Sequence, residues 1–180
     1  ISVIDMRSNR VVGTLEAGAA PVGIDAASDG SRVFAADWYG NRLLVFDPAQ
    51  PRPLASIAVG RAPAGVAVHP DGDTVFVAER DDDSVAAIGL REGRARQRVT
   101  VGSHPFALLY DAPRERLYAL NVLSDDVSVV DLRTMKLTAT VKVGRAPYGA
   151  ALTHAGRLLY VTNQHADTVS VIDADTLAVQ

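Results

Sequence analysis

Short apolar runs of four to seven residues recur along the whole chain, separated by glycine, aspartate and proline. Near the end of the chain these runs are 148–152, 158–162 and 168–172. They are rich in valine, isoleucine, leucine and threonine, which is typical of β-strands. No window of helical length carries an apolar stripe with a period of 3.6 residues. The pattern therefore predicts an all-β chain built from short strands.

The runs belong to a repeat of 42 residues, and each unit has a fourth run on its outer side, at 11–17, 54–59, 95–101 and 137–143. Several positions keep this step without insertions: Gly18, Gly60, Gly102 and Gly144; Pro21, Pro63, Pro105 and Pro147; Phe34, Phe76, Tyr118 and Tyr160; and Asp5, Asp47, Asp131 and Asp173, with Gly89 as the exception. Four strands in a repeat of this length are typical of a β-propeller blade. The fold expected is a β-propeller of four-stranded antiparallel blades.

The repeat register divides the chain into a partial blade at 1–18, whole blades at 19–60, 61–102 and 103–144, and a partial blade at 145–180. Residues 1–5 align on 169–173, so the chain is expected to open in the third strand of one blade and to close early in the fourth strand of another. We therefore expect part of a longer polypeptide, about four blades that form an open arc. Apolar blade faces exposed at the two ends predict self-association through the open blade edges.

The repeated residues have structural explanations. The first strand of each blade is expected at the crowded central axis, where a small residue recurs at Gly23, Gly65, Ala107 and Gly149. The aromatic residue of the second strand is expected to fill the space between stacked blades. The aspartate that ends the third strand is expected to accept hydrogen bonds from the backbone of its own turn. Asp-Gly pairs at 29–30 and 71–72 predict tight hairpins between the first two strands.

Residues 160–163 read Tyr-Val-Thr-Asn, residues 169–173 read Val-Ser-Val-Ile-Asp, and Val143, Gly144 and Pro147 precede them. This stretch resembles the YVTN family of β-propeller repeats, and earlier units fill the same slot more weakly at 33–37, 75–79 and 117–121. The Gly-His and Trp-Asp signature of WD repeats is absent. The resemblance implies a seven-bladed propeller, usually bacterial or archaeal, that is exported to the periplasm or cell surface. It implies no single biochemical activity.

Composition narrows the possible chemistry. The chain has 180 residues, 48% of them hydrophobic, and a formal net charge of −3, which gives no overall attraction to nucleic acid or anionic lipid. No apolar run approaches membrane-spanning length. The absence of cysteine excludes disulfides, thiolate zinc sites and covalent c-type haem. We find no Gly-x-Ser-x-Gly and no phosphate-binding glycine loop. We therefore expect no cofactor and no hydrolytic turnover.

The crossings between blades supply the candidate binding residues. They share the pattern x-x-Pro-x-Gly, with alanine at the last position in the third, and their variable positions are not dictated by the fold. These positions hold Arg61, His104, Phe106, Arg145 and Tyr148, and the neighbouring loops add Trp38, Tyr39, Arg80 and His165. Crossings of a propeller converge at one end of its channel, so we expect one rim that binds a small anionic ligand or a protein surface. Asp25 stands where other units have Ala67, Leu109 and Ala151, and is expected to line the channel.

Structural alternatives accompany these expectations. The two rim arginines have loop carboxylates at 81–83 as possible partners, and Trp38 has the alternative of anchoring its own loop. The three consecutive aspartates lack the ligand spacing of a calcium loop and are expected to be a solvated acidic loop. Arg91, Arg94, Arg96 and Arg98 lack interleaved aromatics, so we expect an outer edge strand and no nucleic-acid site. The four histidines are His69, His104, His154 and His165, of which only His104 and His165 are expected to share the loop face.

Three functions remain open at this point. The first is a non-catalytic binding or scaffold propeller that uses one loop face. The second is a component of a periplasmic oxidoreductase system, with the cofactor held elsewhere. The third is a metal-dependent propeller hydrolase or lactonase, which needs inward-facing ligands from several blades, and only Asp25 fits that requirement.

Overall fold

The computed structural model describes residues 1–153 and 155–180, and its regular elements within them are strands and two short 3-10 turns. The first partial blade contains β1 (Ser2–Asp5) and β2 (Arg10–Thr14). The whole blades contain β3 (Pro21–Ala26), β4 (Val33–Asp37), β5 (Arg42–Phe46) and β6 (Ala55–Ala58); β7 (Pro63–Val68), β8 (Thr74–Glu79), β9 (Ser84–Gly89) and β10 (Arg94–Thr100); and β11 (Pro105–Asp111), β12 (Arg116–Asn121), β13 (Asp126–Asp131) and β14 (Lys136–Lys142). The last partial blade contains β15 (Pro147–Leu152), β16 (Leu158–Asn163) and β17 (Thr168–Asp173). The 3-10 turns are η1 (Arg80–Asp82) and η2 (Ala112–Arg114).

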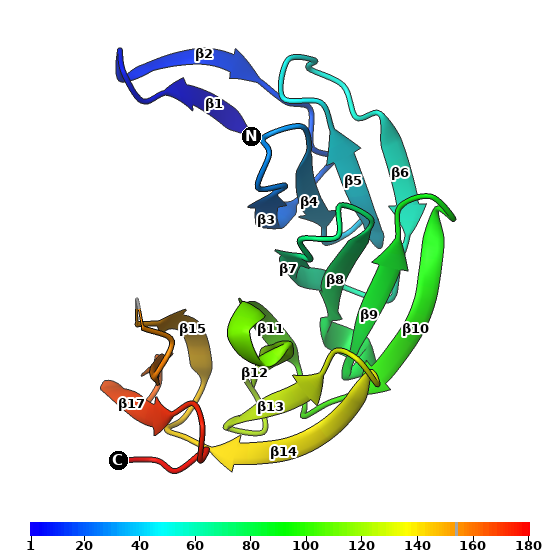
Figure 1. The fold of residues 1–180 in the computed structure, drawn as a ribbon. Helices are drawn as coiled ribbons and strands as arrows, with labels where there is room; N and C mark the ends of the chain where they lie inside the picture. Colours follow the sequence, from blue (N-terminus) through cyan, green and yellow to red (C-terminus); the bar gives the residue numbers. More distant parts are fainter. Residues whose placement is uncertain (154) are drawn as a thin grey trace.

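Each whole blade is a four-stranded antiparallel sheet whose strands pair in chain order. This confirms the predicted β-propeller blades, and the sheets fan out in a curved array with their first strands on the concave side (Figure 1). The two termini lie well apart, so this chain forms an open arc, as expected (Figure 1). An isolated bridge between Ile172 and Val179 marks the beginning of a fourth strand in the last blade.

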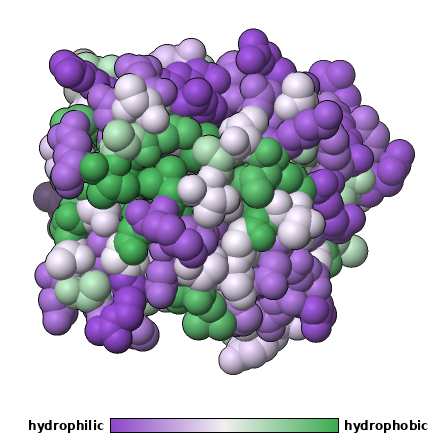
Figure 2. Space-filling model, turned by 90° about the horizontal axis from the view of Figure 1, so that it is seen from below, coloured by the Kyte–Doolittle hydropathy of each residue, from purple (hydrophilic) through white to green (hydrophobic). Residues whose placement is uncertain are grey.

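Apolar side chains pack between successive blades. Phe34 packs with Val75 and Val77 of the next blade, and the equivalent Tyr118 packs with Leu159 of the last blade. These aromatic rings are at most 2% exposed in the three whole blades, whereas the equivalent Tyr160 in the last blade is 39% exposed. The expectation that this ring fills space between blades is thus confirmed. Figure 2 shows hydrophobic residues at the surface on the side that holds the last two blades.

The inner strands approach each other closely, as the small residues there predict. A Cβ atom added at Gly23 would lie 1.9 Å from the carbonyl oxygen of Ala64, and one at Gly65 would lie 2.6 Å from the carbonyl oxygen of Phe106. Both contacts are with backbone atoms of the neighbouring blade, which cannot move aside by a side-chain rotation. The third unit accommodates Ala107 at this position.

The turns follow the sequence expectations. Asp131 accepts hydrogen bonds from the backbone N–H and hydroxyl of Thr134, at 2.9 and 3.0 Å, and these bonds lower its pKa. Asp5, Asp47 and Asp173 bond their own turns in the same way. Gly30 and Gly72 have positive φ in the two Asp-Gly hairpins, whereas the third hairpin uses η2.

A second repeated contact, between blades, was not predicted. In the three whole blades, the residue before the third strand has positive φ, and its side-chain oxygen accepts a hydrogen bond from the backbone N–H of the crossing that follows, 21 residues further on. The bonds run to Asn41 from Ala62 (3.0 Å), to Asp83 from His104 (2.8 Å) and to Asp125 from Ala146 (2.8 Å). The three donor residues also have positive φ. These bonds hold each crossing against the preceding blade and so position the predicted rim.

Candidate functional site

The crossings and the loops between second and third strands lie on one face of the array, here called the loop face. In each blade the loop donates a backbone hydrogen bond to the crossing of the same blade: Trp38 to Ala20, Arg80 to Ala62, Val122 to His104, and Gln164 to Ala146. The predicted rim residues therefore occupy a common face. The hairpins between first and second strands lie at the opposite ends of these strands, on what we call the hairpin face.

A row of aromatic rings crosses the loop face. Phe106 and Tyr148, from the crossings of adjacent blades, stack with ring centroids 4.2 Å apart and an interplanar angle of 29°. Trp38 lies 6.3 Å from Phe106 although it comes from a loop two blades away. The Arg80 guanidinium lies 5.3 Å from the Trp38 ring centroid, within the range of a cation–π contact. Trp38 therefore does more than anchor its own loop, because it reaches across the second blade to the third.

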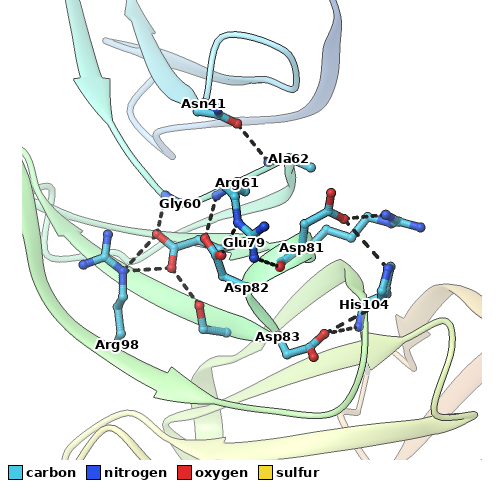
Figure 3. Close-up of polar contacts among 12 residues, drawn as sticks. Asn41, Gly60, Arg61, Ala62, Glu79, Asp81, Asp82, Asp83, Arg98 and His104 are labelled. Atoms are coloured by element: carbon cyan, nitrogen blue, oxygen red, sulfur yellow. Dashed lines mark hydrogen bonds and ion pairs between the residues drawn. The ribbon is translucent and has the colours of Figure 1, made fainter.

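Arg61 is held by its own blade (Figure 3). Asp82 accepts from the backbone N–H of Arg61 at 2.7 Å and from its Nε at 2.6 Å, and the carbonyl of Asp81 accepts from Nη2 at 2.5 Å. The Arg61 N–H and guanidinium lower the pKa of Asp82. The structural alternative therefore applies to Arg61, whose charge is neutralised at the surface.

Arg80 and His104 are also engaged with the acidic loop. Arg80 Nη1 bonds Asp81 at 2.5 Å, and His104 Nε2 lies 3.9 Å from the same carboxylate (Figure 3). His104 Nδ1 lies 3.0 Å from the hydroxyl of Ser103. The run 81–83 is therefore a set of three carboxylates that each contact a cationic or backbone partner, and His104 lies near two of them.

The last crossing differs from the second. Arg145 is exposed and forms no ion pair within the described part of the chain. Tyr148 is 43% exposed beyond its stack with Phe106. His165 is exposed, and its backbone N–H donates to the carbonyl of Arg145 at 3.2 Å, which places the two residues side by side. Tyr39, 77% exposed, adds an aromatic side chain at the tip of the first loop. These are the predicted site residues that remain available to a partner.

Asp25 does not act as an unoccupied channel carboxylate. Its Oδ2 accepts from the backbone N–H of Val68 in the neighbouring inner strand, and its Oδ1 accepts from Ala26, both at 2.8 Å. Asp25 therefore links two blades, which explains a carboxylate at an otherwise apolar position. It also lines a cavity of 680 Å³ on the hairpin face.

The wall of this cavity is mostly apolar, with Tyr110 and His69 on one side. Glu115 accepts from the hydroxyl of Tyr110 at 2.9 Å and lies 3.4 Å from Nε2 of His69. Burial and the bond to Glu115 raise the pKa of Tyr110 to about 12. The sequence did not point to this cavity, because Asp25, His69 and Tyr110 come from three blades and none of them recurs at its own position in the repeat.

The remaining expectations concern metal and nucleic acid. Within the described residues no group of three or more histidine and acidic side chains is arranged to hold a metal ion. His154 lies outside the described residues. On the outer strand, Arg96 pairs with Asp73 and Glu92, and Arg98 pairs with Glu79 at 2.8 Å. This part of the basic cluster is therefore neutralised internally. No helix in the described part of the chain has the length and hydropathy needed to span a membrane.

Comparisons with known proteins identify the class of fold. No protein-family model and no curated protein sequence matches this chain. Solved structures do match: Kuenenia stuttgartiensis hydrazine synthase, with a TM-score of 0.84 and 20% identity over 94% of this chain, and a protein of unknown function from Desulfotomaculum acetoxidans, with 0.78 and 14% over 95%. A candidate 6-phosphogluconolactonase from Bacteroides uniformis matches with 0.73 and 19% over 89%.

At these identities the likeness establishes the β-propeller fold and no activity. The matched regions cover 51%, 57% and 52% of the three solved chains, in the same order. This chain therefore spans about half the length of the propeller proteins that it resembles.

Proposed function

We propose that this chain is a non-catalytic binding propeller whose loop face contacts a partner protein. The observation that carries the proposal is the row formed by Trp38, Phe106 and Tyr148, whose members come from three different blades and which ends in a half-exposed ring. Rigid aromatic residues supply a large contact area at a small cost in conformational entropy, and they are enriched at binding hot spots. Residues from different blades meet there because the fold converges at its inner strands.

The charged residues of the loop face also favour binding of a protein there. The second blade presents Asp81 and Asp83 near His104, while the last blade presents Arg145, a cation without an ion pair among the residues that the structure describes. A surface with an aromatic centre and charges of both signs at its edge resembles a protein-binding site, where the apolar centre supplies affinity and the polar edge orients the partner.

Site-specific photo-cross-linking tests this function. A photoreactive residue at Tyr39 on the loop face should capture the partner in extracts of the source organism, because Tyr39 is 77% exposed beside the aromatic row. The same residue at Met6, 82% exposed in the β1–β2 turn on the hairpin face, is the matched control and should capture little. Trp38→Ala or Tyr148→Ala should lower the yield at position 39 about tenfold or more, as expected for a hot-spot residue. Equal capture at both positions, or no loss in the folded variants, would contradict the proposal.

The second candidate is an accessory propeller of a redox enzyme system. It is favoured by the similarity to a protein named hydrazine synthase, which has the highest TM-score of the three structures above. The cross-linking experiment separates the two candidates, because capture of a redox enzyme subunit at position 39 would select this one. Asp25, the residue on which the hydrolase alternative depends, accepts a backbone hydrogen bond with each of its two oxygens.

We also propose that the chain is a YVTN-type propeller that acts in the periplasm or at the cell surface. The support is the resemblance of residues 160–163 and 169–173 to that family, and both stretches form strands, β16 and β17, that belong to one blade. Fractionation of the source organism should recover the protein with periplasmic or surface marker proteins. Recovery with cytoplasmic markers alone would disprove this localisation.

A further inference from the structure

The repeat provides an internal comparison for the two arginines of the crossings. Arg61 and Arg145 occupy the same repeat position, and the residues 21 positions after them are Asp82 and Ala166. Asp82 binds both the backbone N–H and the guanidinium of Arg61. Ala166 has no carboxylate, so the Arg145 guanidinium is left exposed and without an ion pair in the described residues. The contrast between Asp82 and Ala166 arises within each blade.

The same crossing carries a second group suited to a ligand. Tyr148 stands where the first two whole blades have Val22 and Ala64, and its ring rests on Phe106 with 43% of the residue still exposed. The Arg145 backbone is bonded to the His165 loop, which fixes this part of the crossing. Residues 145–148 therefore present a cation and, three positions later, an aromatic ring that packs on Phe106.

We infer that the fourth crossing binds a carboxylate of the partner. The Arg145 guanidinium pairs with the carboxylate, and the apolar or planar group that bears it packs on Tyr148. The guanidinium fork matches the two oxygens of a carboxylate. The second crossing has an arginine at the same position, but Asp82 of the same chain already pairs with the Arg61 guanidinium. Asp81, which His165 replaces in the last blade, further repels an anion from the second blade. This inference rests on the proposed binding function of the loop face and names its chemistry.

Sodium benzoate is a suitable probe, because it combines a carboxylate with a planar ring, and benzamide is its neutral counterpart. In a nitrogen-15 NMR titration at constant ionic strength, benzoate should shift the Arg145 Nε resonance saturably and leave that of Arg61 in place. Benzamide should not shift the Arg145 Nε resonance. Acetate should bind Arg145 more weakly than benzoate, because it lacks the ring that packs on Tyr148.

Two variants test this contrast: one gives Arg145 a carboxylate partner, and the other removes the carboxylate partner of Arg61. Ala166→Asp supplies Arg145 with the partner that Arg61 has, and it should weaken benzoate binding at Arg145 roughly fivefold, as expected for an exposed ion pair of favourable geometry. Asp82→Asn keeps a side-chain oxygen for the Arg61 backbone N–H and removes the charge. It should make the Arg61 Nε resonance responsive to benzoate. Each variant leaves the other crossing as an internal control in the same sample.

A benzoate shift at Arg61 as large as that at Arg145 in the parent, or an unchanged affinity in Ala166→Asp, would overturn the inference. So would cross-linking at position 39 that is lost in Tyr148→Ala but undiminished in Arg145→Ala, and that result leaves the proposed function intact. Loss of cross-linking in both variants supports the two proposals together. Failure of the function itself is recognised separately, as equal capture on the two faces.

Discussion

Replacing Glu79 by alanine should lower the free energy of unfolding by about 3 kcal/mol, because it leaves buried donors without an acceptor. Glu79 is fully buried at the end of β8. Its Oε1 accepts from the backbone N–H of Gly60 at 2.7 Å, and its Oε2 accepts from the hydroxyl of Ser84 at 2.8 Å. The alanine variant removes both acceptors and leaves a cavity between the crossing and the sheet.

The ion pair with Arg98 should contribute less to this loss. Nε of Arg98 lies 2.8 Å from Glu79, but the arginine side chain is 49% exposed and water solvates its charge in the variant. Glu79→Gln tests this division, because its amide oxygen still accepts from Gly60. We expect it to cost about 1 kcal/mol, the value of one ordinary hydrogen bond. The third and fourth blades carry Asn121 and Asn163 at this position, which shows that the fold accepts an amide there.

Urea denaturation followed by circular dichroism measures both effects. Glu92→Ala is the control, since Glu92 also pairs with an arginine of β10 but is exposed, and its midpoint should stay at the parent value. If Glu79→Ala and Glu79→Gln lower the free energy of unfolding equally, the ion pair with Arg98 accounts for the loss and the buried hydrogen bonds do not.

The repeat explains how much of the fold the sequence predicts. Strand positions, blade boundaries and the buried role of Phe34, Phe76 and Tyr118 all follow from a period that has no insertions. The third-strand aspartates are predictable as well, because a carboxylate that bonds its own turn needs only local geometry.

Contacts between blades were harder to predict. Asn41, Asp83 and Asp125 keep the period in the sequence. Their hydrogen bonds to the crossings, however, join residues 21 positions apart, and both residues of each bond have positive φ. The same limit applied to Asp25, whose partner Val68 lies one blade away. A register identifies equivalent positions, but it does not identify which neighbour each side chain reaches.

The repeat predicts which face of the fold carries the crossings and loops, but it does not predict which of their side chains are already paired within the chain. The members of the candidate site that come from crossings and loops lie on the loop face, because crossings and loops are bonded to each other. Asp25 instead lines the cavity on the hairpin face. The differences between members depend on single substitutions in the facing loop. Asp82 neutralises Arg61, and Ala166 leaves Arg145 available. Comparing position 61 with 82, and 145 with 166, would have revealed this contrast in the sequence.

The inner strands give the second large effect. Gly23→Ala should lower the free energy of unfolding by about 3 kcal/mol, at the upper end of the usual cost of overpacking. The added Cβ would lie 1.9 Å from the carbonyl oxygen of Ala64, so β3 and β7 must separate to accommodate it. That separation would also strain the hydrogen bond between Asp25 and Val68, which joins the same two strands.

Gly149→Ala is the matched control at the same repeat position in the last blade. Among the described residues, its Cβ would meet the Thr162 hydroxyl alone, at 3.3 Å, so we expect a change of no more than about 0.5 kcal/mol. Thermal and urea unfolding of the two variants against the parent measure the difference. A Gly23→Ala variant as stable as the parent would show that the inner strands can move apart without cost. The close approach would then not explain the glycines of the repeat, and the convergence of the crossings that forms the loop-face site would be looser than the structure indicates.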